Sequence, residues 1–151
     1  METDKGVFDV SEQKPKFHKW FHNFLIYFAL WAYALVAMIQ GFLEIQFVVQ
    51  NDPSFGGWFV IVLAVQLMLV GAFLIKVRFD LAKFRPQAPM EMLVACIAAA
   101  VLLVLIGAML YWAQADDFGN RLYYAVVVTV WGLVLYRYYN ERPYLFEGAV
   151  K

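Results

Sequence analysis

The chain has 151 residues, of which 64% are hydrophobic and 16% are charged. Soluble domains are nearer half apolar and a quarter charged, so this composition argues against a water-soluble globular enzyme. Lys and Arg together number 12, as do Asp and Glu, and the resulting net charge of zero provides no field that would attract nucleic acid. The single cysteine, Cys96, excludes an internal disulfide and a cysteine-rich metal site.

Four long apolar runs follow one another along the chain, at residues 24–49, 58–75, 92–112 and 122–139. Each run is long enough to cross a membrane, because about 20 helical residues span a hydrocarbon core about 30 Å thick. Within lipid the backbone must satisfy its own hydrogen bonds, so each run should form an α-helix. The sequence therefore predicts an all-α protein, a four-helix transmembrane bundle whose helices are antiparallel in an up-down-up-down order.

Basic residues orient this predicted bundle. They lie before the first run, between the second and third runs, and after the fourth run. Arg121 is the exception, because it lies on the opposite side beside Asp116 and Asp117. Since Lys and Arg accumulate on the cytoplasmic side of membrane proteins, both termini are expected in the cytoplasm.

The predicted organisation is one membrane domain between two tails. We expect a flexible cytoplasmic tail at residues 1–19, a single four-helix transmembrane domain at residues 20–140 and a cytoplasmic tail at residues 141–151. The helices are expected at about 20–49, 58–79, 90–112 and 121–140. The first apolar run is too long for the apolar region of a cleaved signal peptide, so the acidic tail before it is expected to remain attached.

The connection between the second and third runs is basic and amphipathic. Val77, Leu81 and Phe84 recur at helical spacing, which predicts that the second helix continues into the headgroup layer. The basic residues lie on its other faces and are expected to contact lipid headgroups; they are Lys76, Arg78, Lys83 and Arg85.

Small residues recur seven positions apart within the apolar runs. They are Ala34 and Gly41, then Gly57, Ala64 and Gly71, then Ala100 and Gly107, and finally Ala125 and Gly132. Membrane helices associate where small residues allow close approach, and a seven-residue repeat keeps one seam facing a partner helix. These seams predict a compact bundle and also offer contacts to other membrane helices.

Four polar residues within the apolar runs form a candidate cluster: Gln40, Glu44, Gln66 and Thr129. Polar groups at membrane depth are costly, so each should face a partner or water. Gln40 and Glu44 are four residues apart and share a helix face, and an antiparallel second helix would bring Gln66 to the depth of Glu44. The functional interpretation is a polar pocket that opens outward, with Glu44 as a protonatable group. The alternative is that these groups only hold the helices together.

A second group of candidates lies at the cytoplasmic edge: His18, His22, Asp80 and Glu91. The two histidines are four residues apart and would share a helix face, where imidazole and carboxylate groups could bind a transition metal. The favoured prediction is nevertheless no metal and no cofactor, because two histidines at this spacing among Phe17, Trp20 and Phe21 also fit an aromatic belt at the membrane surface.

Three short strings resemble segments of small bacterial four-helix integral membrane proteins, a family without an assigned activity. They are FALWA at residues 28–32, RFDLAKF at residues 78–84 and YNERPYLF at residues 139–146. The resemblance implies a multi-pass protein of the bacterial inner membrane and supplies no catalytic residues.

Three classes of function are open to such a chain. The leading hypothesis is a non-enzymatic accessory or scaffold subunit that binds other membrane helices, in another membrane protein or in a homo-oligomer, with membrane lipid around it. The runner-up is a small oligomeric transporter or channel that uses Gln40, Glu44 and Gln66. The third class, a membrane enzyme acting on lipid, requires the second group of candidates to converge.

Overall fold

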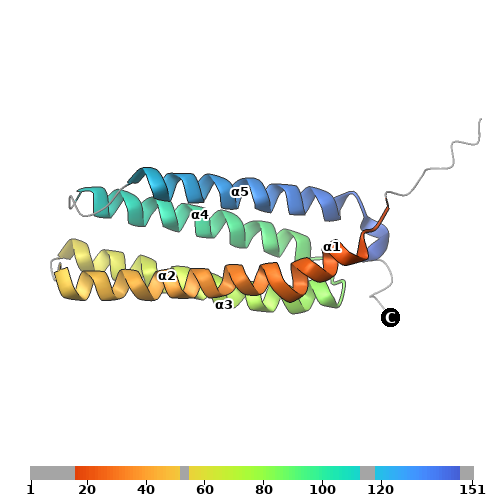
Figure 1. The fold of residues 1–151 in the computed structure, drawn as a ribbon, viewed down its shortest axis with the longest axis horizontal. Coiled ribbons are helices and arrows are strands. Elements are labelled where there is room, and N and C mark those ends of the chain that lie inside the picture. Colours follow the sequence, from red (N-terminus) through yellow and green to blue (C-terminus); the bar gives the residue numbers. More distant parts are fainter. Residues whose placement is uncertain (1–15, 52–54, 113–117, 147–151) are drawn as a thin grey trace, which may run out of the picture.

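The computed structural model describes residues 16–51, 55–112 and 118–146, and within these ranges the fold is built from helices with no strand (Figure 1). The elements are α1 (Lys19–Phe24), η1 (Leu25–Ala29), α2 (Leu30–Asn51), α3 (Phe55–Ala82), α4 (Ala88–Trp112), α5 (Phe118–Asn140) and η2 (Pro143–Leu145). The predicted all-α class is confirmed. Most of the predicted tail 1–19, the turn residues 52–54 and 113–117, and residues 147–151 of the predicted C-terminal tail lie outside the described residues.

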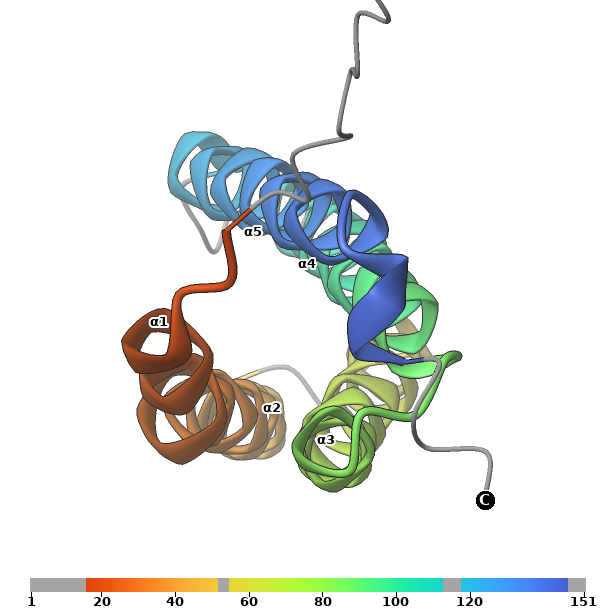
Figure 2. The same cartoon turned by 90° about the vertical axis from the view of Figure 1, so that its right-hand side faces the viewer.

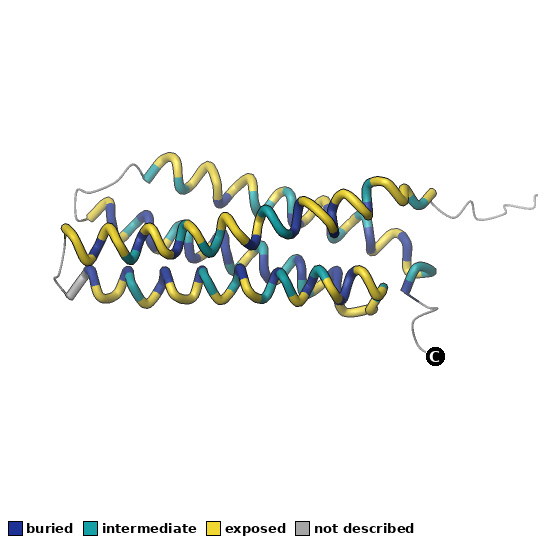
Figure 3. The backbone as a smooth tube through the Cα atoms, turned by 60° about the horizontal axis from the view of Figure 1, so that its bottom comes forward, coloured by how far each residue is buried: buried dark blue, intermediate teal, exposed yellow. Residues whose placement is uncertain are grey.

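Four helical stretches are long and apolar enough to cross a membrane: Lys19–Asn51, Gly57–Ala82, Ala88–Trp112 and Phe118–Asn140. Figure 3 shows that exposed residues follow the outer sides of the helices, whereas buried residues line the interior. Many of the exposed side chains are large and apolar, among them Val36, Leu69 and Val134. A soluble monomer rarely exposes so continuous an apolar surface, so the fold is compatible with a multi-pass membrane protein.

The first membrane-crossing stretch is not one uniform helix. The Leu30 N–H donates to the Leu25 carbonyl, five residues back, so η1 is a π-helical turn between α1 and α2. The Arg78 side chain of α3 reaches this turn, where its Nε donates to the Ile26 carbonyl at 2.9 Å. Inserted side chains and π turns both bend helices, and α1 is inclined to α2 (Figure 1).

Small residues set the contact between α2 and α3. An ideal Cβ on Gly41 would lie 2.7 Å from the Ala64 carbonyl oxygen, and one on Gly71 would lie 2.8 Å from the Ala34 carbonyl oxygen. Moving along α2 from Ala34 to Gly41 therefore moves back along α3 from Gly71 to Ala64, so the two helices run in opposite directions. The seven-residue spacing of small residues is what lets the two backbones approach so closely.

The contact between α4 and α5 follows the same pattern. Gly132 faces Cys96, whose Cβ would lie 2.6 Å from an added Cβ, and Gly107 faces Arg121 and Phe118. Here the neighbours are side chains rather than backbone atoms. One of them, Arg121, is a long charged residue that crosses α4 at the position where α4 has no side chain.

Extensive helix packing follows the order of the chain: α2 packs on α3, α3 on α4, and α4 on α5. Figure 2, viewed along the bundle, shows that this row is curved, with α2 and α5 at its two ends. We call the end with residues 16–24, 83–87 and 141–146 the basic end, and the end with Asn51, Phe55, Trp112 and Phe118 the hairpin end. The polar contacts that link the first stretch to α5 gather at these two ends.

Candidate functional site

Glu44 is a buried carboxylate near the hairpin end of α2. Its residue is 3% exposed, and its Oε1 accepts a hydrogen bond of 2.6 Å from Gln40 Nε2, one helical turn earlier. The four-residue spacing places both side chains on one face, as the sequence predicted. Burial of a carboxylate is costly unless the charge is paired, so the surroundings of Glu44 decide what it does.

The partner of Glu44 is Arg121, from the first turns of α5. Arg121 Nη1 lies 2.7 Å from Glu44 Oε1, and the two side chains are 13% and 4% exposed. The aliphatic stem of Arg121 passes over Gly107 of α4, where an added Cβ would come within 2.9 Å of Arg121 Cδ. From the sequence, Arg121 was only an exception to the charge pattern, and its pairing with Glu44 was not predicted. A signal was available, since Glu44 lies toward the outer end of the first run and Arg121 lies just before the fourth run, on the same side.

Gln66 does not reach this ion pair. Its side chain is exposed on α3, and within the described ranges it has no hydrogen bond or ion pair. The reason is helical phase, because Ala64 and Gly71 occupy the face of α3 that packs on α2. Successive residues are about 100° apart around a helix with 3.6 residues per turn, so Gln66 points about 200° away from Ala64.

Thr129 also has no hydrogen bond to Glu44 among the described residues. Its Oγ1 donates to the Ala125 carbonyl of its own helix at 2.8 Å. This is a common way for a hydroxyl to be satisfied inside a membrane helix without contacting another helix. Of the four predicted residues, the structure therefore joins Gln40 to Glu44, leaves Gln66 and Thr129 elsewhere, and adds Arg121.

The two histidines at the basic end have different environments. His22 is buried, its Nδ1 lies 2.7 Å from the Tyr139 hydroxyl, and its ring stacks on Phe84 with centroids 4.7 Å apart. His18 is exposed, and its backbone N–H donates to the Tyr138 hydroxyl at 3.1 Å. Both contacts fasten the start of the first stretch to the end of α5.

The two carboxylates predicted beside these histidines are held by basic residues instead. Lys76 Nζ lies 3.1 Å from Asp80 and 2.6 Å from Glu91, and Arg85 Nη1 lies 3.0 Å from Asp80. Among the described residues, no three His, Cys, Asp or Glu side chains are grouped so that they could hold a metal ion. Within those residues, the imidazole groups of His18 and His22 do not meet the carboxylates of Asp80 and Glu91, as the hypothesis of a membrane enzyme required.

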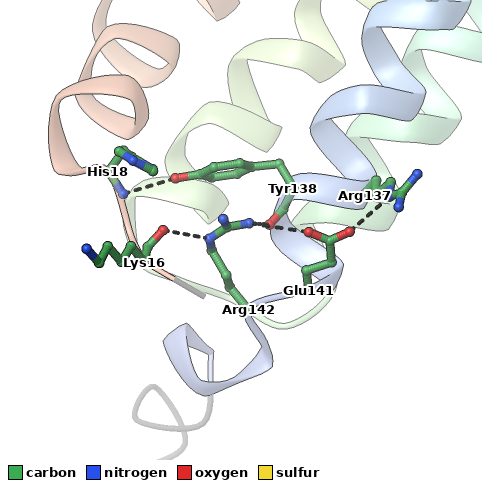
Figure 4. Close-up of polar contacts among 6 residues, drawn as sticks. All are labelled: Lys16, His18, Arg137, Tyr138, Glu141 and Arg142. Atoms are coloured by element: carbon green, nitrogen blue, oxygen red, sulfur yellow. Dashed lines mark hydrogen bonds and ion pairs between the residues drawn. The ribbon is translucent and has the colours of Figure 1, made fainter. Parts of the chain in front are cut away.

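Arg142 links the chain at residue 16 to the end of α5 at the basic end (Figure 4). Its Nε donates to the Lys16 carbonyl at 3.1 Å, its Nη1 donates to the Tyr138 carbonyl, and its guanidinium lies 4.0 Å from the Tyr138 ring centroid. The nearby Arg137 pairs with Glu141 on the surface at 2.9 Å. Arg142 thus ties residue 16 to the last turn of α5 through two carbonyl oxygens that α-helical hydrogen bonds leave free.

A cavity of about 450 Å³ opens beside this cluster. Its lining residues are Pro86, Pro89, Met90, Tyr136, Tyr139, Asn140, Pro143 and Phe146. The lining is mostly rings, with a few polar groups. It is suited to an apolar group rather than to charged chemistry.

The buried polar residues that the structure describes thus fall into two sets, Glu44 at the hairpin end and His22, Asp80 and Arg142 at the basic end. A further buried polar atom, the indole Nε1 of Trp131 in α5, has no hydrogen-bond partner among the described residues. Comparison of the chain with protein-family models, with curated proteins and with solved structures found no match.

Proposed function

We propose that this chain is a multi-pass membrane protein that acts as an accessory or scaffold subunit and binds a transmembrane helix of another membrane protein. The observation that carries the proposal is Gln66, an exposed carboxamide well inside the apolar span of α3. Its exposed neighbours on the same face are apolar: Phe59, Val62 and Leu69. A partner helix on this face would cover the apolar side chains and would also accept hydrogen bonds from the Gln66 carboxamide and donate to it.

The depth of Gln66 makes a partner necessary. Gln66 is 11 residues from the start of α3 and 16 from its end, which is about 16 Å and 24 Å along the helix axis. Water is absent at that depth in a bilayer, and a carboxamide has two donors and an acceptor to satisfy. Glutamine side chains commonly meet this need by hydrogen bonding across to another helix.

We place the basic end of the bundle in the cytoplasm and the protein in a bacterial inner membrane. Arg121 was the one basic residue that opposed this orientation. It is one basic residue against the eleven Lys and Arg on the other side, and the orientation follows that excess. We expect membrane lipid around the bundle and no nucleic acid, cofactor or catalysed reaction.

The proposal is tested by photo-cross-linking in native membranes. A photoreactive residue at position 69 should form an adduct with a different membrane protein, identified by mass spectrometry. Gln66→Leu should lower the adduct yield about 3- to 30-fold, because a hydrogen bond between membrane helices contributes about 0.6–2 kcal/mol. Gln50→Leu, an exposed glutamine at the end of α2, should leave the yield unchanged.

Two results would contradict the accessory role. Adducts formed only with a second copy of this chain would make it a homo-oligomer. Recovery of the protein without any adduct would leave the α3 face facing lipid alone.

The buried ion pair favours a second candidate, a small transporter or channel. Glu44 and Arg121 carry opposite charges at membrane depth near the hairpin end, and a charge pair there is a common feature of ion pathways. If Glu44 couples proton movement, Glu44→Gln should abolish proton flux into proteoliposomes measured with an internal pH-sensitive dye. Glu141→Gln, at an exposed carboxylate, is the matched control. Unchanged flux in Glu44→Gln would reject transport through this site.

A further inference from the structure

Among the residues that the structure describes, Arg78 is the arginine without a carboxylate partner. Arg85, Arg121, Arg137 and Arg142 each lie within ion-pair distance of an Asp or Glu. Arg78, which lies in the part of the chain that the structure describes, has no such pair. Its positive charge is therefore not neutralised by a described acidic side chain.

Contacts on several sides nevertheless fix the guanidinium of Arg78. Its Nε donates to the Ile26 carbonyl in the π-helical turn η1 at 2.9 Å. Its Cζ lies 4.7 Å from the Phe79 ring centroid, 5.2 Å from that of Trp31 and 5.7 Å from that of Tyr27. The group is thus held in place, with the four N–H bonds of its two terminal nitrogens left for a ligand.

The position of Arg78 indicates which ligand. It lies four residues before the end of α3, about 6 Å along the axis, where headgroups begin if α3 spans the membrane. Tyr27 and Phe79 are largely exposed there, as aromatic residues are at a membrane surface. The terminal nitrogens of Arg78 have no hydrogen-bond partner among the described residues and are not buried, so they reach the surface.

We propose that Arg78 binds the phosphate group of a membrane phospholipid at the seam between η1 and α3. The planar fork of a guanidinium matches two phosphate oxygens, which a lysine ammonium does not. Lys76 pairs with Asp80 and Glu91, and Arg85 pairs with Asp80. Lys83 has no cation–π contact among the described residues, so the site is specific to Arg78 among the four basic residues of this segment. The inference rests on the membrane location given under the proposed function.

The test uses the full-length protein in nanodiscs of phosphatidylcholine with a minor fraction of phosphatidylglycerol. After release into detergent, native mass spectrometry measures how much phosphatidylglycerol stays bound. Arg78→Gln should retain about tenfold less than wild type, the loss expected for a charge-assisted pair of hydrogen bonds. Lys83→Gln removes an exposed charge at the same end and should retain as much as wild type.

A second variant keeps the test decisive if Arg78→Gln disturbs the fold. Arg78→Lys keeps the charge, and its retention should fall between those of wild type and Arg78→Gln. Full retention by Arg78→Lys, or equal losses in Arg78→Gln and Lys83→Gln, would overturn the site, because any cation would then suffice.

Added inorganic phosphate should not release the bound lipid. Displacement of the lipid by inorganic phosphate would identify a site for free phosphate and would contradict the assignment of a phospholipid as the ligand. Failure of the protein to enter nanodiscs would overturn the membrane location as well, whereas insertion without lipid retention would overturn this inference alone.

Discussion

The first membrane-crossing stretch, Lys19–Asn51, is held to α5 in different ways at the two ends of the bundle. At the hairpin end, an ion pair between Glu44 and Arg121 crosses from α2 to α5. At the basic end, several smaller contacts share the task, including His22 with Tyr139 and Arg142 with the Lys16 carbonyl. One end therefore depends on a buried charge pair, whereas the other depends on several contacts, among them a buried His–Tyr contact and a buried arginine that donates to backbone carbonyls.

The difference predicts unequal sensitivity to substitution. Removing one member of a buried ion pair leaves the other charge without compensation, which is more costly than losing any one hydrogen bond. At the basic end each contact is backed by its neighbours. Mutation at the two ends should therefore separate the two modes of attachment.

The largest effect is expected for Arg121→Gln. It leaves the Glu44 carboxylate buried with only Gln40 as a described partner, and the free energy of unfolding should fall by about 3–5 kcal/mol. Unfolding with SDS in mixed micelles measures the loss. The double variant Glu44→Gln with Arg121→Gln should recover most of it, because no buried charge remains. A double variant as unstable as the single one would contradict the ion-pair account.

Gly107→Ala should have an intermediate effect that acts through Arg121. The new methyl group meets Arg121 Cδ and displaces the side chain from Glu44, which should cost about 1–3 kcal/mol. In the double variant that lacks both charges, this cost should fall by half or more.

Gly71→Ala is the matched control for that coupling. It meets the Ala34 carbonyl far from the ion pair, so its cost should be the same in both backgrounds. If the effects of Gly107→Ala and of the double variant simply add, the proposed role of Gly107 in making room for Arg121 is wrong.

The smallest effect is expected for Tyr139→Phe at the basic end. It removes the hydroxyl that contacts His22 but keeps the buried ring, so the loss of unfolding free energy should be about 1 kcal/mol. Tyr136→Phe, whose hydroxyl has no hydrogen bond among the described residues, should change stability by less. A loss in Tyr139→Phe as large as that of Arg121→Gln would show that the basic end also depends on one contact.

The sequence was sufficient to predict the helices and part of their packing. Long apolar runs indicated helices because lipid forces the backbone to pair internally, and the structure has a helix in each. The small residues Ala34 and Gly41 predicted a seam, and they contact Gly71 and Ala64. Such features depend on local composition and spacing, which a single sequence contains.

The features that the sequence did not predict depend on which face of each helix packs inward and on how far a long side chain extends. Gln66 was expected beside Glu44, but the small residues of α3 took the packing face and turned Gln66 outward. Arg121 reaches Glu44 because α4 has a glycine where the stem crosses it, which is a property of three helices at once. The π-helical turn η1 contains neither Pro nor Gly, the residues that usually indicate a break in a helix, so it could not be predicted from the sequence.

The most direct measurement asks on which side of the membrane each end lies. In a Cys96→Ala background, single cysteines replace Asn51 at the hairpin end and Lys19 at the basic end, both exposed positions. A membrane-impermeant maleimide added to intact cells should label Asn51→Cys at once and Lys19→Cys only after the cells are opened. Labelling of both positions from the same side would contradict a bundle whose two ends face opposite sides of the membrane.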